Sequence, residues 1–377
     1  MKVTALVQLE IDVPEEFWFP DVEPFLQALQ EQHGVAAYVL SCQRADPDNT
    51  TYVVMPTDAP AAPPASEWTE AGWYAEALPW IDEHISRTGP PVQVRVWGLS
   101  NVLRVPTADG LVYFKAHAHS STLPPAKLPL LFAHEPLLLT SLEGPVPRPL
   151  AIDENRVWML LPDLGSSLEA EPEIATWIDA VQSHARLQRS YVGRVDHLLE
   201  ISCVDRRLAV LAAELDDLLG DNPATTLLEP DERAGLPTRR AELRAAIAEL
   251  AAIGIPETLL HGDLHPGNLA VREGQVLAFD WTDAAVSHPF LDMVTFIHEK
   301  SPLSHDPQVR DAYLAEWTDY APMTDLSRAL ALAEQIGALH QVATSLHLAA
   351  NLSGPDRESM LRGATWWLRQ VVNGTAR

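Results

Sequence analysis

The sequence contains little cysteine and no long apolar run, and each shortage excludes a class of protein. Two cysteines, Cys42 and Cys203, cannot build a disulfide framework or a zinc cluster alone, so we interpret both as small buried apolar residues. No apolar run approaches the roughly 20 residues of a membrane span. The first residues, MKVTALVQLEIDVPEE, have one Lys followed by carboxylates and no small-residue cleavage site. We therefore expect a cytoplasmic protein with no membrane partner.

Basic residues are also scarce, because 26 Lys and Arg stand against 52 Asp and Glu, for a formal net charge of −26. A surface of this sign repels nucleic acid and attracts cations, so nucleic acid is not an expected partner. Two explanations remain open. The acidity is a general adaptation for solubility, or carboxylates line a pocket for a cationic, amine-bearing substrate.

The chain has 377 residues, 47% of them apolar and 21% charged, which is typical of a folded protein with at least one sizeable core. We expect three regions. Residues 1–66 form a β-α-β-β segment and a Pro/Ala linker (PTDAPAAPPAS), residues 67–165 form a β-rich lobe, and residues 166–377 form a mainly helical lobe. The predicted fold class is α+β with two lobes and an N-terminal α/β extension.

Local patterns predict individual elements of the first two regions. A strand is expected over residues 3–11, and Asp21 is expected to cap a helix that ends before Gly34. A hairpin is expected around ADPDN. Pro79 should bend or split the helix over 68–87. VQVRVWG alternates strictly, which predicts a strand with its valines on one face.

One loop concentrates residues that touch metals or move protons. In HGDLHPGN, His261, Asp263, His265 and Asn268 fall within eight residues, with two Gly and one Pro that fix an irregular backbone. Asp280 follows seventeen residues after Asp263, at the end of the apolar strand VLAF. A carboxylate at the end of a buried strand is costly unless something binds it, and a metal ion is the obvious partner.

HGDLHPGN followed by FDW resembles the catalytic loop and metal-binding segment of the aminoglycoside phosphotransferase and choline kinase group, a branch of the protein-kinase-like fold. The resemblance covers residues 90–300 by motif. It implies that Asp263 is the catalytic base, which accepts the proton of a substrate hydroxyl, and that Asn268 and Asp280 hold Mg²⁺. His261 would fix the loop by hydrogen bonds, and His265 lies where this group usually keeps a His.

The same resemblance requires a Lys on the third strand of the β lobe and a Glu on the next helix. Lys115 in LVYFKA and Glu135 in FAHEP stand at those places. Lys115 would bind the α- and β-phosphates of ATP, and Glu135 would hold Lys115 by an ion pair. The phosphate-covering turn has one Gly, so backbone N–H groups and the Ser100 hydroxyl would reach the phosphates. Adenine would lie at residues 160–164. Asp292 would support the catalytic loop.

Other polar and aromatic residues have structural interpretations. We expect Asp283 to cap the turn after Asp280. His340 and His347, with Trp366 and Trp367, follow helical spacing, which is typical of core or groove-lining positions.

The predicted activity is ATP- and Mg²⁺-dependent phosphorylation of a small-molecule hydroxyl, on an aminoglycoside, amino sugar, other sugar or amino alcohol. Two rival functions are a metal-dependent hydrolase built on His261, Asp263 and His265, and a nucleotide-binding regulatory module without turnover. The hydrolase needs further zinc ligands. The non-catalytic module would normally have lost one of the residues that bind nucleotide or metal, and none is missing.

Overall fold

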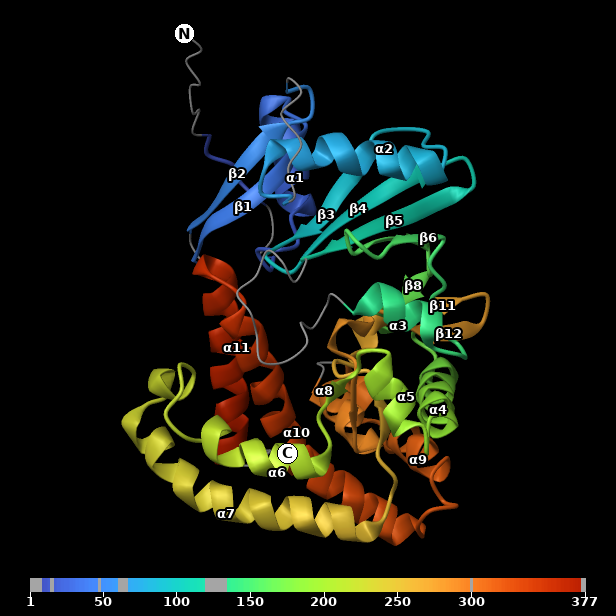
Figure 1. Ribbon diagram of the computed structural model, residues 1–377, viewed down its shortest axis with the longest axis vertical. Coiled ribbons are helices and arrows are strands. Elements are labelled where there is room, and N and C mark those ends of the chain that lie inside the picture. Colours follow the sequence, from blue (N-terminus) through green and yellow to red (C-terminus); the bar gives the residue numbers. More distant parts are fainter. Residues whose placement is uncertain are drawn as a thin grey trace.

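The computed structural model describes residues 9–13, 17–46, 49–59, 67–118, 134–298 and 301–373. The chain forms two lobes, with a sheet and its covering elements in one and mostly helices in the other (Figure 1). Within the described parts, no helix combines the length and the apolar character that crossing a membrane needs.

The N-terminal segment consists of a helix, α1 (Glu23–His33), and a hairpin of β1 (Ala37–Asp46) and β2 (Asn49–Pro56). The predicted hairpin is confirmed, and so is the end of α1 at Gly34, which adopts φ 72° and donates its N–H to Gln30. The prediction that Asp21 caps α1 is wrong: Val22 is the N-cap, and Asp21 instead pairs with Arg95 at 2.6 Å. Most of the predicted strand over 3–11 lies outside the described residues.

A five-stranded antiparallel sheet, in the order β3-β4-β5-β7-β6, forms the centre of the N-lobe. Its strands are β3 (Val92–Val96), β4 (Ser100–Thr107), β5 (Gly110–His117), β6 (Ala151–Asp153) and β7 (Trp158–Pro162). The predicted one-sided valine face of β3 is wrong, because a register shift lies between Gln93 and Arg95. The shift buries the Gln93 side chain, while Val92 is 38% exposed.

Buried Gln93 joins the N-terminal hairpin to this sheet. Its amide exchanges hydrogen bonds with Val39, accepting from the backbone N–H at 2.7 Å and donating to the carbonyl at 3.2 Å. It also donates to Tyr74 and Asn101. One apolar cluster runs from α1 and β1 through the sheet, and includes Val22, Leu26, Val39, Trp73, Phe114 and Trp158. α1 and β1 therefore contribute side chains to the N-lobe core.

Two helices accompany the sheet. α2 (Tyr74–His84) contains Pro79 without being split, and a short 3₁₀ turn, η1 (Ala71–Trp73), precedes it. α2 lies along the sheet in Figure 1. α3 (Glu135–Ser141) begins at Glu135, with Pro136 in its first turn. This position places the Glu135 carboxylate next to the sheet.

The C-lobe is built from helices with apolar residues at spacings of three and four, as the sequence predicts. The long helices α10 and α11 pack on one another, with α10 between α7 and α8 and with α11 reaching towards β1 (Figure 1). The helices are α4 (Ile174–Ser190), α5 (Val195–Glu200), α6 (Leu208–Leu218), α7 (Pro230–Ile253), α8 (Asp292–His298), α9 (Pro307–Ala315), α10 (Met323–Ala350) and α11 (Gly354–Asn373).

Short strands interrupt these helices around the loop HGDLHPGN. β11 (Leu269–Arg272) and β12 (Gln275–Ala278) form a hairpin through Glu273 and Gly274, both with positive φ. β8 (Ser166–Ser167) extends this sheet. β10 (Thr258–Leu260), β13 (Ala285–Ser287) and β9 (Val204–Asp205) form another three-stranded sheet, in the order β10-β13-β9. β10 leads directly into the loop that contains Asp263.

Candidate active site

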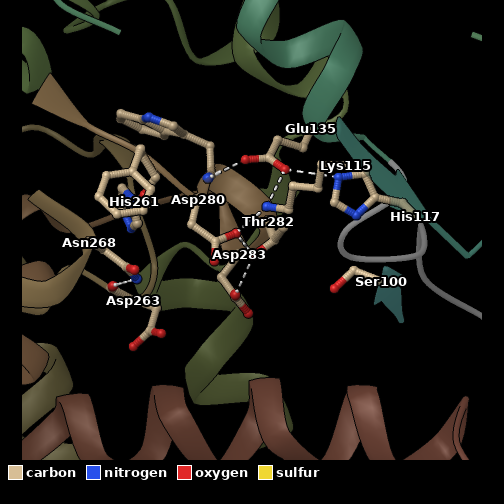
Figure 2. Close-up of polar contacts among 12 residues, drawn as sticks. Ser100, Lys115, His117, Glu135, His261, Asp263, Asn268, Asp280, Thr282 and Asp283 are labelled. Atoms are coloured by element: carbon tan, nitrogen blue, oxygen red, sulfur yellow. Dashed lines mark hydrogen bonds and ion pairs between the residues drawn. The ribbon is translucent and has the colours of Figure 1, made fainter. Parts of the chain in front are cut away.

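Lys115, Glu135 and Asp280 meet between the lobes, although 165 residues separate the first from the last. Lys115 Nζ on β5 donates to Glu135 Oε2 at 2.7 Å and to Asp280 Oδ1 at 2.6 Å. Figure 2 shows the lysine between the two carboxylates. His117, two residues along β5 and on the same face, places Nε2 2.9 Å from Glu135 Oε2. The strand period therefore aims two nitrogen-bearing side chains at one buried carboxylate.

The charges at this cluster stabilise one another. Burial alone would raise the pKa of Glu135 and of Asp280, but the Lys115 ammonium holds both pKa values below their usual range. Burial alone would lower the pKa of Lys115, and the charges of Asp280 and Glu135 raise it instead. All three groups are therefore ionised at neutral pH, and the Lys115 ammonium is held between two carboxylates.

The backbone at Asp280 has the left-handed conformation, with φ 62° and ψ 60°. A non-glycine residue in this region stores strain and persists where surrounding contacts fix it, often at functional sites. Here the next residue, Trp281, donates its backbone N–H to Glu135 Oε1 at 2.8 Å. Its carbonyl lies 3.2 Å from Nε2 of His134. The segment that carries Asp280 is thus bound directly to the start of α3.

Asp292 at the start of α8 holds the catalytic loop. Its carboxylate accepts the backbone N–H of His261 and of Gly262, both at 2.9 Å. It also accepts from Gln188 on α4 at 3.0 Å and lies 2.8 Å from His184 Nε2. The Asp292 side chain is buried with four polar partners, so it has no capacity left to act on a substrate.

Asp263 and Asn268 are brought together within this loop. Asn268 Nδ2 donates to the backbone carbonyl of Asp263 at 3.0 Å, which fixes the amide and leaves its Oδ1 for another partner. Figure 2 shows the Asp263 and Asp283 carboxylates extending to the same side of the view. The side chain of Asp263 is 44% exposed, so solvent or a substrate can reach it.

The residues fit a Mg²⁺ ion. Asn268 Oδ1 and the Asp280 carboxylate are oxygen donors of the type this ion prefers. Burial and then the charges of Asp263 and Asp280 raise the pKa of Asp283 to about 8. The Thr282 hydroxyl donates to Asp280 Oδ1 and to Asp283 Oδ2, both at 3.1 Å. A divalent cation held by Asn268 and Asp280 would supply positive charge to these carboxyl groups.

The two loop histidines are occupied with the loop itself. His261 is fully buried, and its Nε2 lies 2.8 Å from the Phe279 carbonyl, next to Asp280. His265 accepts the backbone N–H of Gly267 at its Nδ1, and its Nε2 is 4.0 Å from Asp263 Oδ2. In the parts of the chain that the structure describes, no three His, Cys, Asp or Glu side chains are grouped so as to hold a metal.

The turn expected to cover the phosphates has its polar groups in use. Ser100 is 2% exposed, and its hydroxyl accepts from the indole N–H of Trp97 at 2.9 Å. Gly98 donates its backbone N–H to Asp356 Oδ2 of α11 at 2.9 Å. A Cβ on Gly98 would come within 2.6 Å of Leu352 Cδ2 and 3.0 Å of Asp356 Oδ2, so a larger residue would have to displace these side-chain ends. The tip of the α10–α11 pair thus touches this turn directly.

Five of the predicted site residues lie at the junction of the lobes: Lys115, Glu135, Asp263, Asn268 and Asp280. Ser100 stands apart from them in Figure 2. Other residues at this junction carry no signal in the sequence alone. Examples are His117, His134, Thr282 and Asp356. Strand spacing relates His117 to Lys115, but contacts between distant segments have no local pattern.

A sheet-containing lobe and a helical lobe thus meet at the cluster of Lys115, Glu135 and Asp280. The sequence model of the phosphotransferase enzyme family matches residues 91–326, more than half of the chain. The chain belongs to this family. No curated protein matches it significantly.

Solved structures with the same fold include three phosphotransferases. A choline/ethanolamine kinase family protein from Mesorhizobium loti is 15% identical, with a TM-score of 0.52 over 79% of this chain and 92% of its own. The GDP and kanamycin complex of APH(2")-IIia is 14% identical, with a TM-score of 0.55 over 81% and 99%. A macrolide 2'-phosphotransferase from Brachybacterium faecium is 16% identical, with a TM-score of 0.52 over 81% and 99%. The expected protein-kinase-like fold is confirmed.

Proposed function

We propose that this protein transfers the γ-phosphoryl group of ATP to a hydroxyl group of a small molecule. The observation that carries the proposal is the position of Lys115, whose ammonium joins a helix of the N-lobe to the metal-binding segment of the C-lobe through Glu135 and Asp280. A buried cation held in this way is suited to bind the α- and β-phosphates of a nucleotide.

Asn268 and Asp280 are the residues that would hold Mg²⁺. Both offer oxygen atoms, and the Asn268 amide is oriented by its bond to the Asp263 carbonyl. When bound, the ion would supply positive charge against the phosphates during transfer. Lys115 would exchange its bond to Asp280 for bonds to phosphate, and Glu135 would keep it in place.

Asp263 is the proposed catalytic base. Its carboxylate accepts the hydroxyl proton of the acceptor and orients the oxygen towards the γ-phosphorus. Asp292 contributes by position, because its bonds to the N–H groups of His261 and Gly262 fix the backbone just before Asp263. Most of the rate then comes from placing the two substrates and from electrostatic stabilisation.

The geometry favours this activity over the two rivals. A zinc hydrolase would need His261 and His265 as ligands, but the His261 ring is bonded to Phe279 and His265 accepts from Gly267. A non-catalytic module would not need Asp263 to remain accessible beside Asn268. Neither rival accounts for Lys115, Glu135 and Asp280 in one cluster.

Replacing Asp263 tests the proposal. We expect Asp263→Ala to bind Mg·ATP within about twofold of the wild type and to lose at least ~10²-fold in turnover, because only the general base is removed. Nucleotide affinity is measured by calorimetry, and turnover by ATP consumption over a panel of sugars, amino sugars, aminoglycosides and amino alcohols. Asp109→Ala, in the exposed β4–β5 turn, is the control. Wild-type turnover in Asp263→Ala would remove the residue from this role.

A further inference from the structure

Glu135 is a buried carboxylate with partners from both lobes. Its side chain is 0% exposed. Oε2 lies 2.7 Å from Lys115 Nζ and 2.9 Å from His117 Nε2, so one oxygen faces two nitrogen atoms from β5. Oε1 accepts the backbone N–H of Trp281 at 2.8 Å. An ionised carboxylate at this depth depends on protein donors, and leaving one of its oxygen atoms short of donors is costly.

The His117 ring is held at the end of β5. His117 pairs with Ser100 of β4, and its backbone N–H donates to the Val157 carbonyl at 3.0 Å. The residue is 1% exposed. Lys115 and His117 are two positions apart on one face of the strand, and Figure 2 shows both side chains at the Glu135 carboxylate. The strand backbone therefore fixes the ring next to Glu135 Oε2.

A second partner for Glu135 Oε2 matters because Lys115 has to change its own partners. Its Nζ is shared between Glu135 at 2.7 Å and Asp280 at 2.6 Å. In the phosphoryl transfer proposed above, Nζ leaves Asp280 for the nucleotide phosphates and stays with Glu135. If Lys115 were the only donor to Oε2, this buried oxygen would draw the ammonium away from the phosphates. A second donor at 2.9 Å reduces that pull and keeps the oxygen in place.

A neutral imidazole is suited to this position. Burial lowers the pKa of His117, so the ring is uncharged at neutral pH and has one N–H group. Next to an ionised carboxylate, the tautomer with the proton on Nε2 is favoured. The ring thus adds a donor without adding a second positive charge, and Lys115 remains the group that attracts the phosphates. A lysine or arginine in its place would compete with Lys115 for Glu135.

We propose that His117 is a positioning residue for phosphoryl transfer, whose Nε2–H holds Glu135 Oε2 while Lys115 moves to the phosphates. The inference rests on the kinase function proposed above, and it adds to that function a residue that acts only through Glu135 and Lys115. Loss of His117 therefore weakens the binding of the nucleotide phosphates. It leaves unchanged the binding of the acceptor and of adenosine, which has no phosphate.

Three substitutions at His117 test the inference in the full chain. His117→Gln places an amide N–H close to the position of Nε2, His117→Asn has an amide too short to reach Glu135, and His117→Leu has no donor. We expect the KM for Mg·ATP to rise at least ~10-fold in His117→Asn and His117→Leu and to stay within ~3-fold of the wild type in His117→Gln, because only glutamine restores the donor. ATP consumption with the best acceptor of the panel above measures these values.

Two further constants separate positioning from a general loss of structure. The inhibition constant of adenosine against ATP and the acceptor KM should stay within ~2-fold of the wild type in all three variants, because neither ligand meets Lys115 through a phosphate. His84→Leu on α2 is the control. It removes another N-lobe histidine, whose Nδ1 lies 2.8 Å from the Trp80 carbonyl, and it should change none of these constants.

Three results overturn the role of His117: an unchanged KM for Mg·ATP in His117→Leu, a His117→Gln variant no better than His117→Asn, or an equal loss of ATP and adenosine binding. If His117→Leu does not fold, the comparison of glutamine with asparagine decides. The kinase function is judged separately, by whether ATP turnover with any acceptor depends on Asp263. Absence of that turnover in the wild type overturns both proposals, whereas Asp263-dependent turnover with an unaltered His117→Leu variant overturns only this one.

Discussion

Asp280 is the residue for which Lys115 and the proposed metal ion would compete. In the structure its Oδ1 accepts from both Lys115 and Thr282. The proposed metal would bind the same carboxylate, while Lys115 turns to the phosphates. One side chain thus stabilises the lysine before nucleotide binds and the metal afterwards. The left-handed backbone at Asp280, with φ 62°, aims the carboxylate at both.

Asp280→Asn keeps the shape of this side chain and removes its charge. We expect the Mg²⁺ concentration that gives half-maximal turnover to rise at least ~10-fold, since an amide is a much weaker ligand for this ion. Turnover at saturating Mg²⁺ should fall as well. Titration of activity with MgCl₂ measures both effects. Asp109→Asn, in an exposed turn, serves as the control, and an unchanged Mg²⁺ dependence would remove Asp280 from the metal site.

Residue types and spacing singled out Lys115, Glu135 and Asp280, and the fold brings these three side chains into contact. They were not sufficient for groups whose role depends on packing. His134 joins the site through a contact with Trp281 across the lobes, and Thr282 through bonds to its neighbours Asp280 and Asp283. Ser100 had the right location in sequence, but its hydroxyl is buried against Trp97.

At the scale of elements, α10 presses against α8 at Gly337. A Cβ at this glycine would come within 2.7 Å of Val294 Cβ, a distance that real side chains do not reach. Val294 belongs to α8, and α8 begins with Asp292, which holds the catalytic loop. The close approach of two helix backbones therefore fixes the depth of α8 and, through Asp292, the position of Asp263.

Gly337→Ala should lower the free energy of unfolding by about 1–3 kcal/mol, which is typical of overpacking in a core. Turnover should fall as well, because α8 must shift. Val294→Ala in the same chain should restore part of both losses. Gly363→Ala on α11 is the matched control, since its nearest neighbour would lie 3.9 Å away and alanine favours a helix. Equal stability of the two alanine variants, measured by urea unfolding, would contradict the argument.

Helices and strands followed from the pattern of apolar residues where one face is buried. The errors have specific causes. The alternation in VQVRVWG gave no warning of the register shift that buries Gln93. The N-cap of α1 is Val22 and not Asp21, whose carboxylate pairs with Arg95. In both cases an interaction with a distant segment outweighed a local preference.

At the scale of the whole molecule, Asp356 connects the lobes directly. Its carboxylate accepts from the Gly98 N–H, while its Oδ1 is buried without a partner in the described chain. Burial raises the pKa of Asp356 to about 6, and the bond from Gly98 offsets this only in part. The folded protein therefore binds this proton more tightly than the unfolded chain does.

This difference makes interlobe stability depend on pH. The stabilising contribution of Asp356 is fullest below its unfolded pKa of about 4 and is lost as the pH rises through about 6. Asp356→Asn keeps an acceptor for Gly98, so it should exceed the wild type in unfolding free energy by ~2 kcal/mol at pH 8. At pH 4.5 the gain should fall below ~1 kcal/mol.

Urea unfolding at the two pH values measures the effect. Glu358→Gln, at an exposed position on the same helix, should change stability by less than ~0.5 kcal/mol at both. A gain for Asp356→Asn that is equal at pH 4.5 and pH 8 would show that the carboxyl group does not titrate against the Gly98 turn.

Gln93 has a consequence for the smallest piece of this chain that folds by itself. The region shared with the family begins at residue 91 and ends at residue 326. The partners of Gln93 include Val39 and Tyr74, which lie before that region, and most of α10 and all of α11 lie after it. A polypeptide trimmed to the shared region would leave Gln93 with only Asn101 of these partners, and it would expose the apolar faces that the missing segments cover. The smallest piece of this chain that folds by itself is therefore longer than the region shared with the family, residues 91–326.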